Sequence, residues 1–332
     1  MVNRKPDFFI VGAPKSGTSA MDHYLGEHPD IFMARKEMHH FGKDLRFAPK
    51  IYRRDVQAYL AEFEGCGEKQ CAGESSVWYL FSKEAAREIK TFNPEARIII
   101  MLRQPAEMMY SLYNFFRYDD NEHLAGFEEA LAAEAERKAG RRLTRQTYFA
   151  QGLIYREVAS YTDQVQRYFE VFGRERVHVV LYDDFSADPA AACRQTLQFL
   201  GVDPVALKSN FEVINSARVV KSKGLRWLMR EPALRMIAMK LRPTLPWAFG
   251  ALQRMESRLQ KLNTRCEKPA PMSPETREKL RLEFRPEIDR LGQLLGKDLS
   301  NWNRAGRGAD APMQQSTTNH HDHACLVSAG IY

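Results

Sequence analysis

Three short apolar runs alternate with helical patterns, and this alternation limits the folds that are open to the chain. The runs are residues Phe8–Gly12, 97–103 and 177–182. Continuous apolar runs of this length are typical of strands that are buried on both faces of a parallel sheet. We therefore expect an α/β fold of the P-loop-like type, in which helices flank a central parallel sheet in three layers.

Helix signals lie between and after the predicted strands. Proline suits the first position of a helix and glycine the position after the last, so both residues mark helix ends. The sequence predicts a helix from Thr18 to Gly26 and further helices at residues 82–90, 105–116, 156–172, 188–200 and Pro274–Leu295.

The charge of the chain is concentrated in one segment. The net charge is +7, but residues 218–265 alone carry +10, so the remainder is slightly acidic. A slightly acidic body excludes a general nucleic-acid binder and leaves an anionic acceptor or a membrane surface as partner of the basic segment. We predict one domain over residues 1–304, with a basic helical insertion at about 219–265 and a disordered tail at 305–332.

The five cysteines are scattered and form no C-x-x-C pair. This pattern argues against a disulfide framework and against a zinc site, so we expect no metal. The first apolar run, residues 8–13, is shorter than the roughly 7 to 15 residues of a signal-peptide core. We therefore expect a cytoplasmic protein.

A loop that suits an anion follows the first predicted strand. It reads Gly-Ala-Pro-Lys15-Ser16-Gly17-Thr18-Ser19 and leads directly into a predicted helix. Backbone N–H groups and the positive end of the helix would surround a phosphate-like group in such a turn. The alternative is a plain strand-to-helix turn, which is common in α/β proteins.

The same loop differs from that of a nucleotide triphosphatase. Such enzymes place lysine directly before Ser or Thr, where it spans the outer phosphates. Gly17 occupies that position here, and Lys15 lies two residues earlier. Asp183, which follows a predicted strand as a Walker-B residue would, keeps a P-loop nucleotide kinase as an alternative.

A second candidate half-site follows the run at residues 97–103. Arg103 stands at the carboxyl end of this predicted strand, where open parallel sheets bind ligands, and Ser111 lies in the next helix. The forked donors of arginine and the hydroxyl of serine can converge on one dianion. A surface ion pair and a solvated helix position are the alternatives for the two residues.

Taken together, these motifs resemble the sulfotransferases that use 3′-phosphoadenosine 5′-phosphosulfate (PAPS), and most of all the bacterial and heparan-sulfate-type branch. The motifs are APKSGTS, then KEMHHFG at residues 36–42, GESSVWYL at 73–80, LRQPAEMMYSLY at 102–113, GLIYREVASYTDQVQRYF at 152–169 and LLGKDLSNW at 294–302. The chain departs from that branch at Ser75, where a lysine is frequent, and at Gly42, where an acidic residue is frequent.

The resemblance implies a sulfotransferase that moves a sulfuryl group in line from PAPS to a hydroxyl of a carbohydrate, lipid or small-molecule acceptor. It implies that the loop residues Lys15, Ser16, Gly17, Thr18 and Ser19 hold the 5′-phosphosulfate, with Lys15 also stabilising the leaving group, and that Arg103 and Ser111 bind the 3′-phosphate. A general base must take the acceptor's proton. Glu37 matches the family's base, and His39 is the second candidate because its ordinary pKa is near neutral.

The basic segment adds two further possibilities. Lys221 and Lys223 are candidates for the cofactor's adenine side, with a solvated basic face as the alternative. Basic residues beside tryptophan and methionine in residues 219–265 are also typical of a helix that lies on an anionic membrane. A non-enzymatic module that binds anions or membranes therefore remains an alternative to the enzyme.

Overall fold

A five-stranded sheet, parallel throughout, forms the centre of the protein. The computed structural model describes residues 4–48, 55–207, 209–211, 218–220, 264–266 and 270–304. The strand order is β2 (Ile31–Met33), β3 (Cys71–Ser75), β1 (Phe8–Gly12), β4 (Arg97–Leu102) and β5 (Val177–Leu181). Every neighbouring pair is parallel. The predicted class, an α/β fold with a central parallel sheet, is confirmed.

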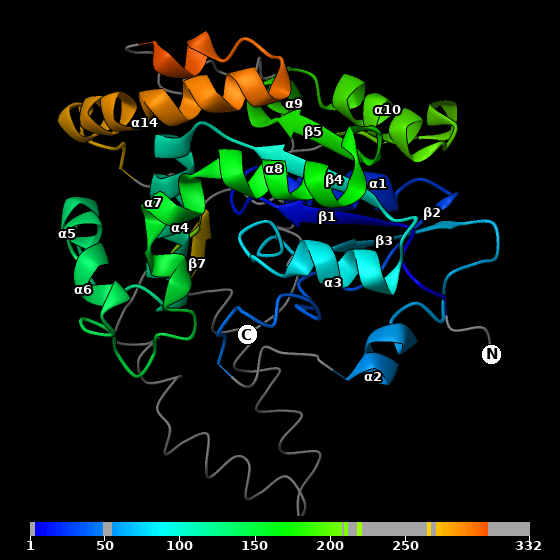
Figure 1. Cartoon of the computed structure of the whole chain (residues 1–332), viewed down its shortest axis with the longest axis horizontal. Coiled ribbons are helices and arrows are strands. Elements are labelled where there is room, and N and C mark those ends of the chain that lie inside the picture. Colours follow the sequence, from blue (N-terminus) through cyan, green and yellow to red (C-terminus); the bar gives the residue numbers. More distant parts are fainter. Residues whose placement is uncertain are drawn as a thin grey trace, which may run out of the picture. The chain divides into compact units, whose positions relative to one another are not determined.

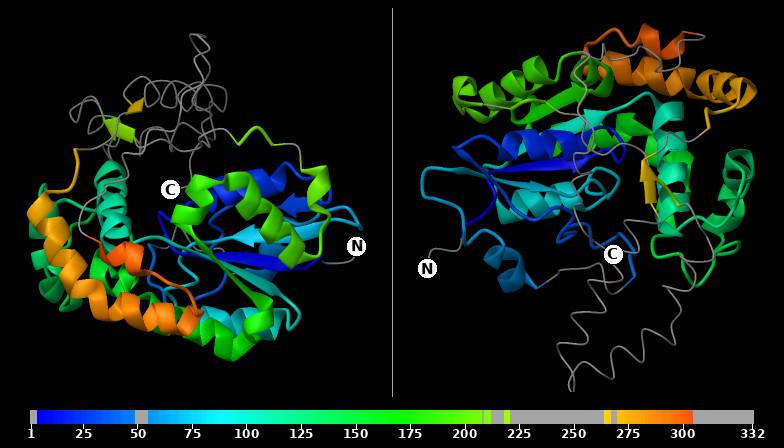
Figure 2. Two further views of the ribbon diagram at one scale, coloured as in Figure 1. Left: turned by 90° about the horizontal axis from the view of Figure 1, so that it is seen from above. Right: turned by 180° about the vertical axis from the view of Figure 1, so that it is seen from behind.

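Helices cover both faces of this sheet (Figures 1 and 2). Residues that alternate along β1 point to opposite faces, so Phe8 and Ile10 enter one apolar core while Phe9 and Val11 enter the other. The first core is closed by α1 (Thr18–Gly26), α9 (Tyr182–Ala187) and α10 (Pro189–Leu200). The second is closed by α3 (Ala85–Phe92), α4 (Pro105–Asp119), α7 (Tyr155–Ala159), α8 (Tyr161–Phe172) and α14 (Pro274–Leu295).

The helix ends follow the signals in the sequence. Pro189 is the first residue of α10, the Asp188 side chain accepts a hydrogen bond from the Ala191 N–H group at 2.8 Å, and Gly201 ends the helix in the left-handed conformation. The α14 helix is capped in the same way by Ser273 and Gly296. Its buried residues recur at helical spacing and are Thr276, Leu280, Phe284, Ile288 and Leu291.

The predicted single helix at residues 156–172 is wrong, because the chain forms two helices there. Ser160 leaves the helical conformation with ψ of 82°, and its hydroxyl donates to the Arg156 carbonyl at 2.8 Å. Serine competes with the helical backbone in this way. The break separates α7 from α8.

The remaining elements of the first 211 residues and of residues 270–304, as far as the structure describes them, are short. They are α2 (Val56–Ala61), α5 (Phe127–Ala132), α6 (Glu134–Lys138) and four single 3₁₀ turns at Gln151–Leu153, Arg174–Arg176, Pro204–Ala206 and Ser300–Asn303. No helix in the described ranges is long and apolar enough to cross a lipid bilayer. Cys66, Cys71 and Cys193 are free thiols.

The chain divides into two units. The sheet and its helices belong to the first, which comprises residues 1–215 and 272–306, and residues 216–271 and 307–332 form the second. In the second unit, β6 (Arg218–Val220) pairs antiparallel with β7 (Thr264–Cys266). The predicted helical insertion and the predicted tail at 305–332 otherwise lie outside the described residues.

Candidate active site

The carboxyl ends of three strands bring most of the predicted site residues to one edge of the sheet. The anion loop follows β1, Glu37 and His39 follow β2, and Arg103 follows β4. In open parallel sheets this edge is where ligands bind. Sequence segments that lie up to about ninety positions apart therefore meet at one place.

The loop between β1 and α1 has the form of an anion cradle. Gly17 has a φ of 89° and stands at the amino end of α1, whose first residue, Thr18, is buried. The N–H groups of Ser16, Gly17, Thr18 and Ser19 make no backbone hydrogen bond within the described chain. A side chain at position 17 would lie 3.1 Å from the ring of Tyr182, so glycine also keeps the turn compact.

Two cations border this cradle. The Lys15 amine lies 4.6 Å from the centre of the Phe115 ring, and the Arg103 guanidinium lies 4.7 Å from that of Tyr182. Arg103 also donates to the Lys15 carbonyl at 3.4 Å. Ser111 is half-buried on the second turn of α4, the helix that carries Phe115. Lys15 and Arg103 therefore provide positive charge at the loop.

Lys36 is a third cation at the cradle, and no role was predicted for it from the sequence. Its amine donates to the Ser19 hydroxyl at 2.7 Å and to the Thr18 hydroxyl at 3.3 Å. It also lies 3.9 Å from a carboxylate oxygen of Glu37. Lys36 thus connects the anion loop with the candidate base. The place of Lys36 directly before Glu37 in the KEMHHFG motif is the sequence feature that could have indicated this role.

Glu37 is held in a largely buried position at the same edge. Its side chain is 15% exposed, and one carboxylate oxygen accepts the Val77 N–H group at 3.2 Å. Burial raises the pKa of Glu37 to about 7, against the opposing effects of the Lys36 charge and the Val77 hydrogen bond. A carboxyl group that titrates near neutral pH can accept a proton from a substrate and release it again.

His39 and His40 occupy apolar surroundings. The His39 side chain is fully buried, stacks on Phe47 at 4.5 Å, and has one ring nitrogen 3.6 Å from a Glu37 oxygen. Burial lowers the pKa of His39 to about 3, so the ring is neutral at physiological pH. His40 stacks on Tyr59 at 4.1 Å. This packing favours a supporting role for both rings over contact with an acceptor.

Other candidates from the sequence lie elsewhere. Asp183 accepts the indole N–H group of Trp302 at 2.6 Å, a contact that ties the end of the described chain to α9. Lys221 and Lys223 lie outside the described residues. In the described ranges, no group of three or more histidine, cysteine, aspartate and glutamate side chains could hold a metal ion.

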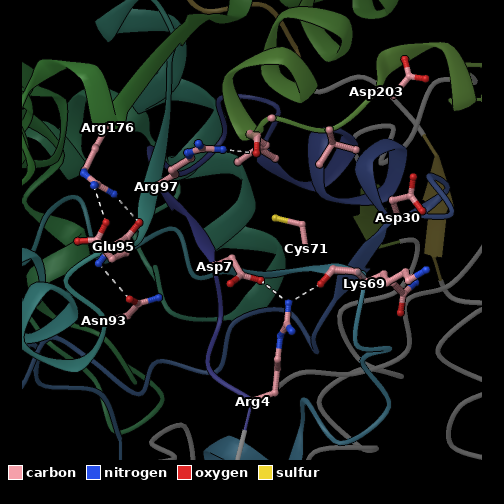
Figure 3. Close-up of a pocket in the computed structure, with 14 residues that line it drawn as sticks. Arg4, Asp7, Asp30, Lys69, Cys71, Asn93, Glu95, Arg97, Arg176 and Asp203 are labelled. Atoms are coloured by element: carbon pink, nitrogen blue, oxygen red, sulfur yellow. Dashed lines mark hydrogen bonds and ion pairs between the residues drawn. The ribbon is translucent and has the colours of Figure 1, made fainter.

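A cavity of about 630 Å³ opens at the opposite edge of the sheet (Figure 3). Its lining includes Asp7, Cys71 and Arg97, which stand at the amino ends of β1, β3 and β4. Arg4 and Asp7 form an ion pair there at 2.8 Å, and Arg176 pairs with Glu95 at 2.6 Å. The cavity is therefore separate from the anion loop and from Glu37.

The fold and this edge define an α/β enzyme domain with an anion loop, clustered cations and a candidate carboxyl base. The model of the sulfotransferase domain family matches residues 5–231, so the chain belongs to the sulfotransferases and contains a PAPS-dependent sulfotransferase domain.

Comparisons with individual proteins agree with this family. The chain resembles the crystal structure of a sulfotransferase from Alicyclobacillus acidocaldarius, with a TM-score of 0.65 and 30% identity, covering 91% of this chain and 100% of that one. It is 30% identical over 113 residues to the membrane-associated sulfotransferase kil1 of Dictyostelium discoideum, covering 33% of this chain. It is 25% identical over 206 residues, 61% of this chain, to the human bifunctional heparan sulfate N-deacetylase/N-sulfotransferase 3. The matched region spans 23% of each of these two relatives.

Proposed function

We propose that this sulfotransferase moves a sulfuryl group from PAPS to an acceptor hydroxyl, with Glu37 as the general base and without a metal ion. The arrangement of Lys36 carries the proposal, because its amine donates to the Thr18 and Ser19 hydroxyls of the anion loop and lies 3.9 Å from a carboxylate oxygen of Glu37. This places the candidate base next to the loop that would hold the phosphosulfate.

The residues present fit such a co-substrate. When bound, PAPS supplies an activated sulfuryl group on a phosphate leaving group. The N–H groups of Ser16 to Ser19 bind its 5′-phosphate, and Arg103 with Ser111 binds the 3′-phosphate. Lys15 stabilises charge that develops on the leaving oxygen. Glu37 takes the proton of the acceptor hydroxyl at a carboxylate oxygen.

Several observations favour this reading over the alternatives. Gly17 stands where a triphosphatase has lysine, and Lys15, Lys36 and Arg103 supply the positive charge that magnesium supplies there. His39 is neutral and fully buried, which favours Glu37 as the base. An anionic acceptor and contact of residues 219–265 with a membrane surface stay predictions, as does the cytoplasmic location.

Arg103→Ala should weaken binding of the bisphosphate product PAP by at least tenfold, because a charge-assisted pair with the 3′-phosphate is lost. Titration calorimetry with PAP measures the effect. Wild-type protein should also gain thermal stability with PAP and little with ATP and magnesium, since ATP lacks a 3′-phosphate. The control is Arg176→Ala, at the opposite edge of the sheet. Unchanged PAP affinity in Arg103→Ala would contradict the assignment.

The kcat/KM of the enzyme should rise with pH through an apparent pKa of about 7, because Glu37 must lose its proton to act as base. Lys36 lowers the pKa of Glu37, so the rise in kcat/KM should occur at higher pH in Lys36→Met. Lys43→Met removes an exposed lysine that pairs with Glu84 and Glu88, and kcat/KM should rise at the same pH as in the wild type. An unchanged pH dependence of kcat/KM in Lys36→Met would contradict Glu37 as the titrating group.

A further inference from the structure

A buried carboxyl group lies at the carboxyl end of β3, next to the segment that carries Glu37. Glu74 is fully buried and accepts three hydroxyl hydrogen bonds. Ser76 donates to its Oε1 atom at 2.6 Å, Tyr79 donates to the same atom at 2.8 Å, and Tyr59 donates to Oε2 at 2.6 Å. Neither the resemblance nor the proposed mechanism gives Glu74 a role.

Two of these hydroxyls also hold the segment that follows Glu37. The Ser76 hydroxyl accepts the N–H group of His39 at 3.2 Å. The Tyr79 hydroxyl accepts those of His40 at 2.8 Å and Phe41 at 3.3 Å. A backbone N–H group can only donate, so both hydroxyls must accept from the segment and give their own hydrogen to Glu74. Oε1 of Glu74 therefore accepts the hydrogens that the Ser76 and Tyr79 hydroxyls must give away while they accept from the segment.

The segment needs such support because its backbone is strained. Glu37 has a φ of 59° and His39 a φ of 49°, both in the left-handed region that non-glycine residues rarely adopt. Strained conformations of this kind persist only where the surrounding structure imposes them. The Glu37 N–H group also donates to the Ser75 carbonyl at 2.8 Å, so β3 and the residues directly after it hold the segment throughout.

We propose that Glu74 is a positioning residue, which acts through Ser76 and Tyr79 to hold the 37–41 segment and so to orient Glu37 toward the acceptor hydroxyl. This inference rests on the proposed function of Glu37. A carboxylate that is displaced by about 1 Å can lose about 100-fold in rate, so the network acts on turnover more than on cofactor binding.

The test compares two substitutions of Glu74. Glu74→Leu removes the acceptor, and we expect kcat to fall about tenfold or more, while the KM for PAPS and the Kd for PAP stay near their wild-type values. Glu74→Gln keeps an acceptor oxygen for Ser76 and Tyr79 and turns its amide toward Tyr59, so most of the turnover should return. A merely structural role would not produce this rescue.

Tyr59→Phe is the matched control. It removes a hydrogen bond from the same carboxyl group but keeps the ring that stacks on His40. We expect kcat to stay within about twofold of the wild type, because Tyr59 gives no hydroxyl contact to the backbone of the segment. If Glu74→Leu does not fold, the double variant Ser76→Ala/Tyr79→Phe replaces it and should show the same loss of kcat.

Two outcomes would overturn the inference. One is a kcat in Glu74→Leu, or in the double variant, that equals that of the wild type. The other is an equal loss in Glu74→Leu, Glu74→Gln and Tyr59→Phe, which would indicate only a structural role. The proposed function is tested separately, because wild-type protein that transfers nothing from PAPS, or full activity in Glu37→Gln, defeats that function whatever the Glu74 variants do.

Discussion

Glu37→Gln should lower kcat by about 100-fold or more, and PAP should still bind with nearly wild-type affinity. Glutamine keeps the shape of the side chain and can still accept from the Val77 N–H group, but it cannot take a proton from the acceptor. The residues that would hold the nucleotide are elsewhere, in the anion loop and at Arg103. Steady-state kinetics with PAPS measure the loss of kcat, and titration calorimetry with PAP measures the affinity for the nucleotide.

The control for this substitution is Glu27→Gln. Glu27 lies on the protein surface after α1, where it pairs with His23, and its change should leave kcat unaltered. Full activity in Glu37→Gln combined with loss of activity in His39→Ala would identify His39 as the base instead.

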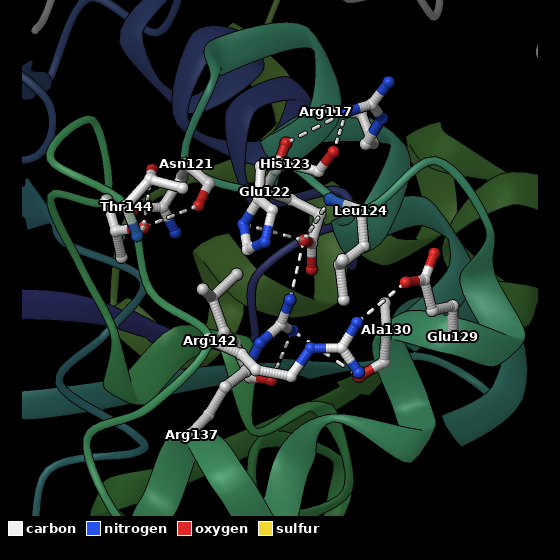
Figure 4. Close-up of polar contacts among 12 residues, drawn as sticks. Arg117, Asn121, Glu122, His123, Leu124, Glu129, Ala130, Arg137, Arg142 and Thr144 are labelled. Carbon is white, nitrogen blue, oxygen red and sulfur yellow. Dashed lines mark hydrogen bonds and ion pairs between the residues drawn. The ribbon is translucent and has the colours of Figure 1, made fainter.

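Arg137→Met should lower the free energy of unfolding by about 3–5 kcal/mol, because it leaves a buried carboxylate without its partner. Arg137 and Glu122 form an ion pair at 2.7 Å (Figure 4), and neither side chain is exposed. The Glu122 carboxylate also accepts from Tyr155 at 2.8 Å and from the Leu124 N–H group at 2.9 Å. Denaturant unfolding of the purified variant measures the loss.

A neighbouring ion pair provides the control. Arg142 pairs with Glu129 at 2.8 Å (Figure 4), but both side chains are at least one third exposed. Arg142→Met should therefore cost less than about 1 kcal/mol. The double variant Glu122→Gln/Arg137→Met removes both charges and should recover part of the loss. Equal effects of Arg137→Met and Arg142→Met would contradict the account.

The central strands could be predicted because they are buried on both faces. Their side chains must all be apolar, and this produces runs such as FFIVG that have no other simple explanation. The strands β2 and β3 were missed because β2 has only three residues and β3 reads CAGES. Short strands with glycine and polar residues give no periodic signal, and only the pairing of β3 with β1 and of β2 with β3 identifies them.

The candidate site was predictable only in part, for a related reason. The anion loop and Arg103 stand directly after strong strands, so their common edge follows from the fold class. The roles of Lys36 and Glu74 depend on contacts between segments, such as the bond of Lys36 to Ser19 and that of Ser76 to His39. Apart from the place of Lys36 directly before Glu37, local sequence patterns contain no information on such contacts.

The most direct test of the central claim is a transfer assay with wild-type protein. The protein is incubated with sulfur-labelled PAPS, a panel of hydroxyl-bearing carbohydrates, lipids and small alcohols, and a metal chelator, and the products are identified by mass spectrometry. The account predicts a sulfated acceptor with PAP formed in equal amount, and its near-complete loss in Glu37→Gln. A product that forms only with ATP and magnesium, or transfer from PAPS that stops when the chelator is added, would contradict it.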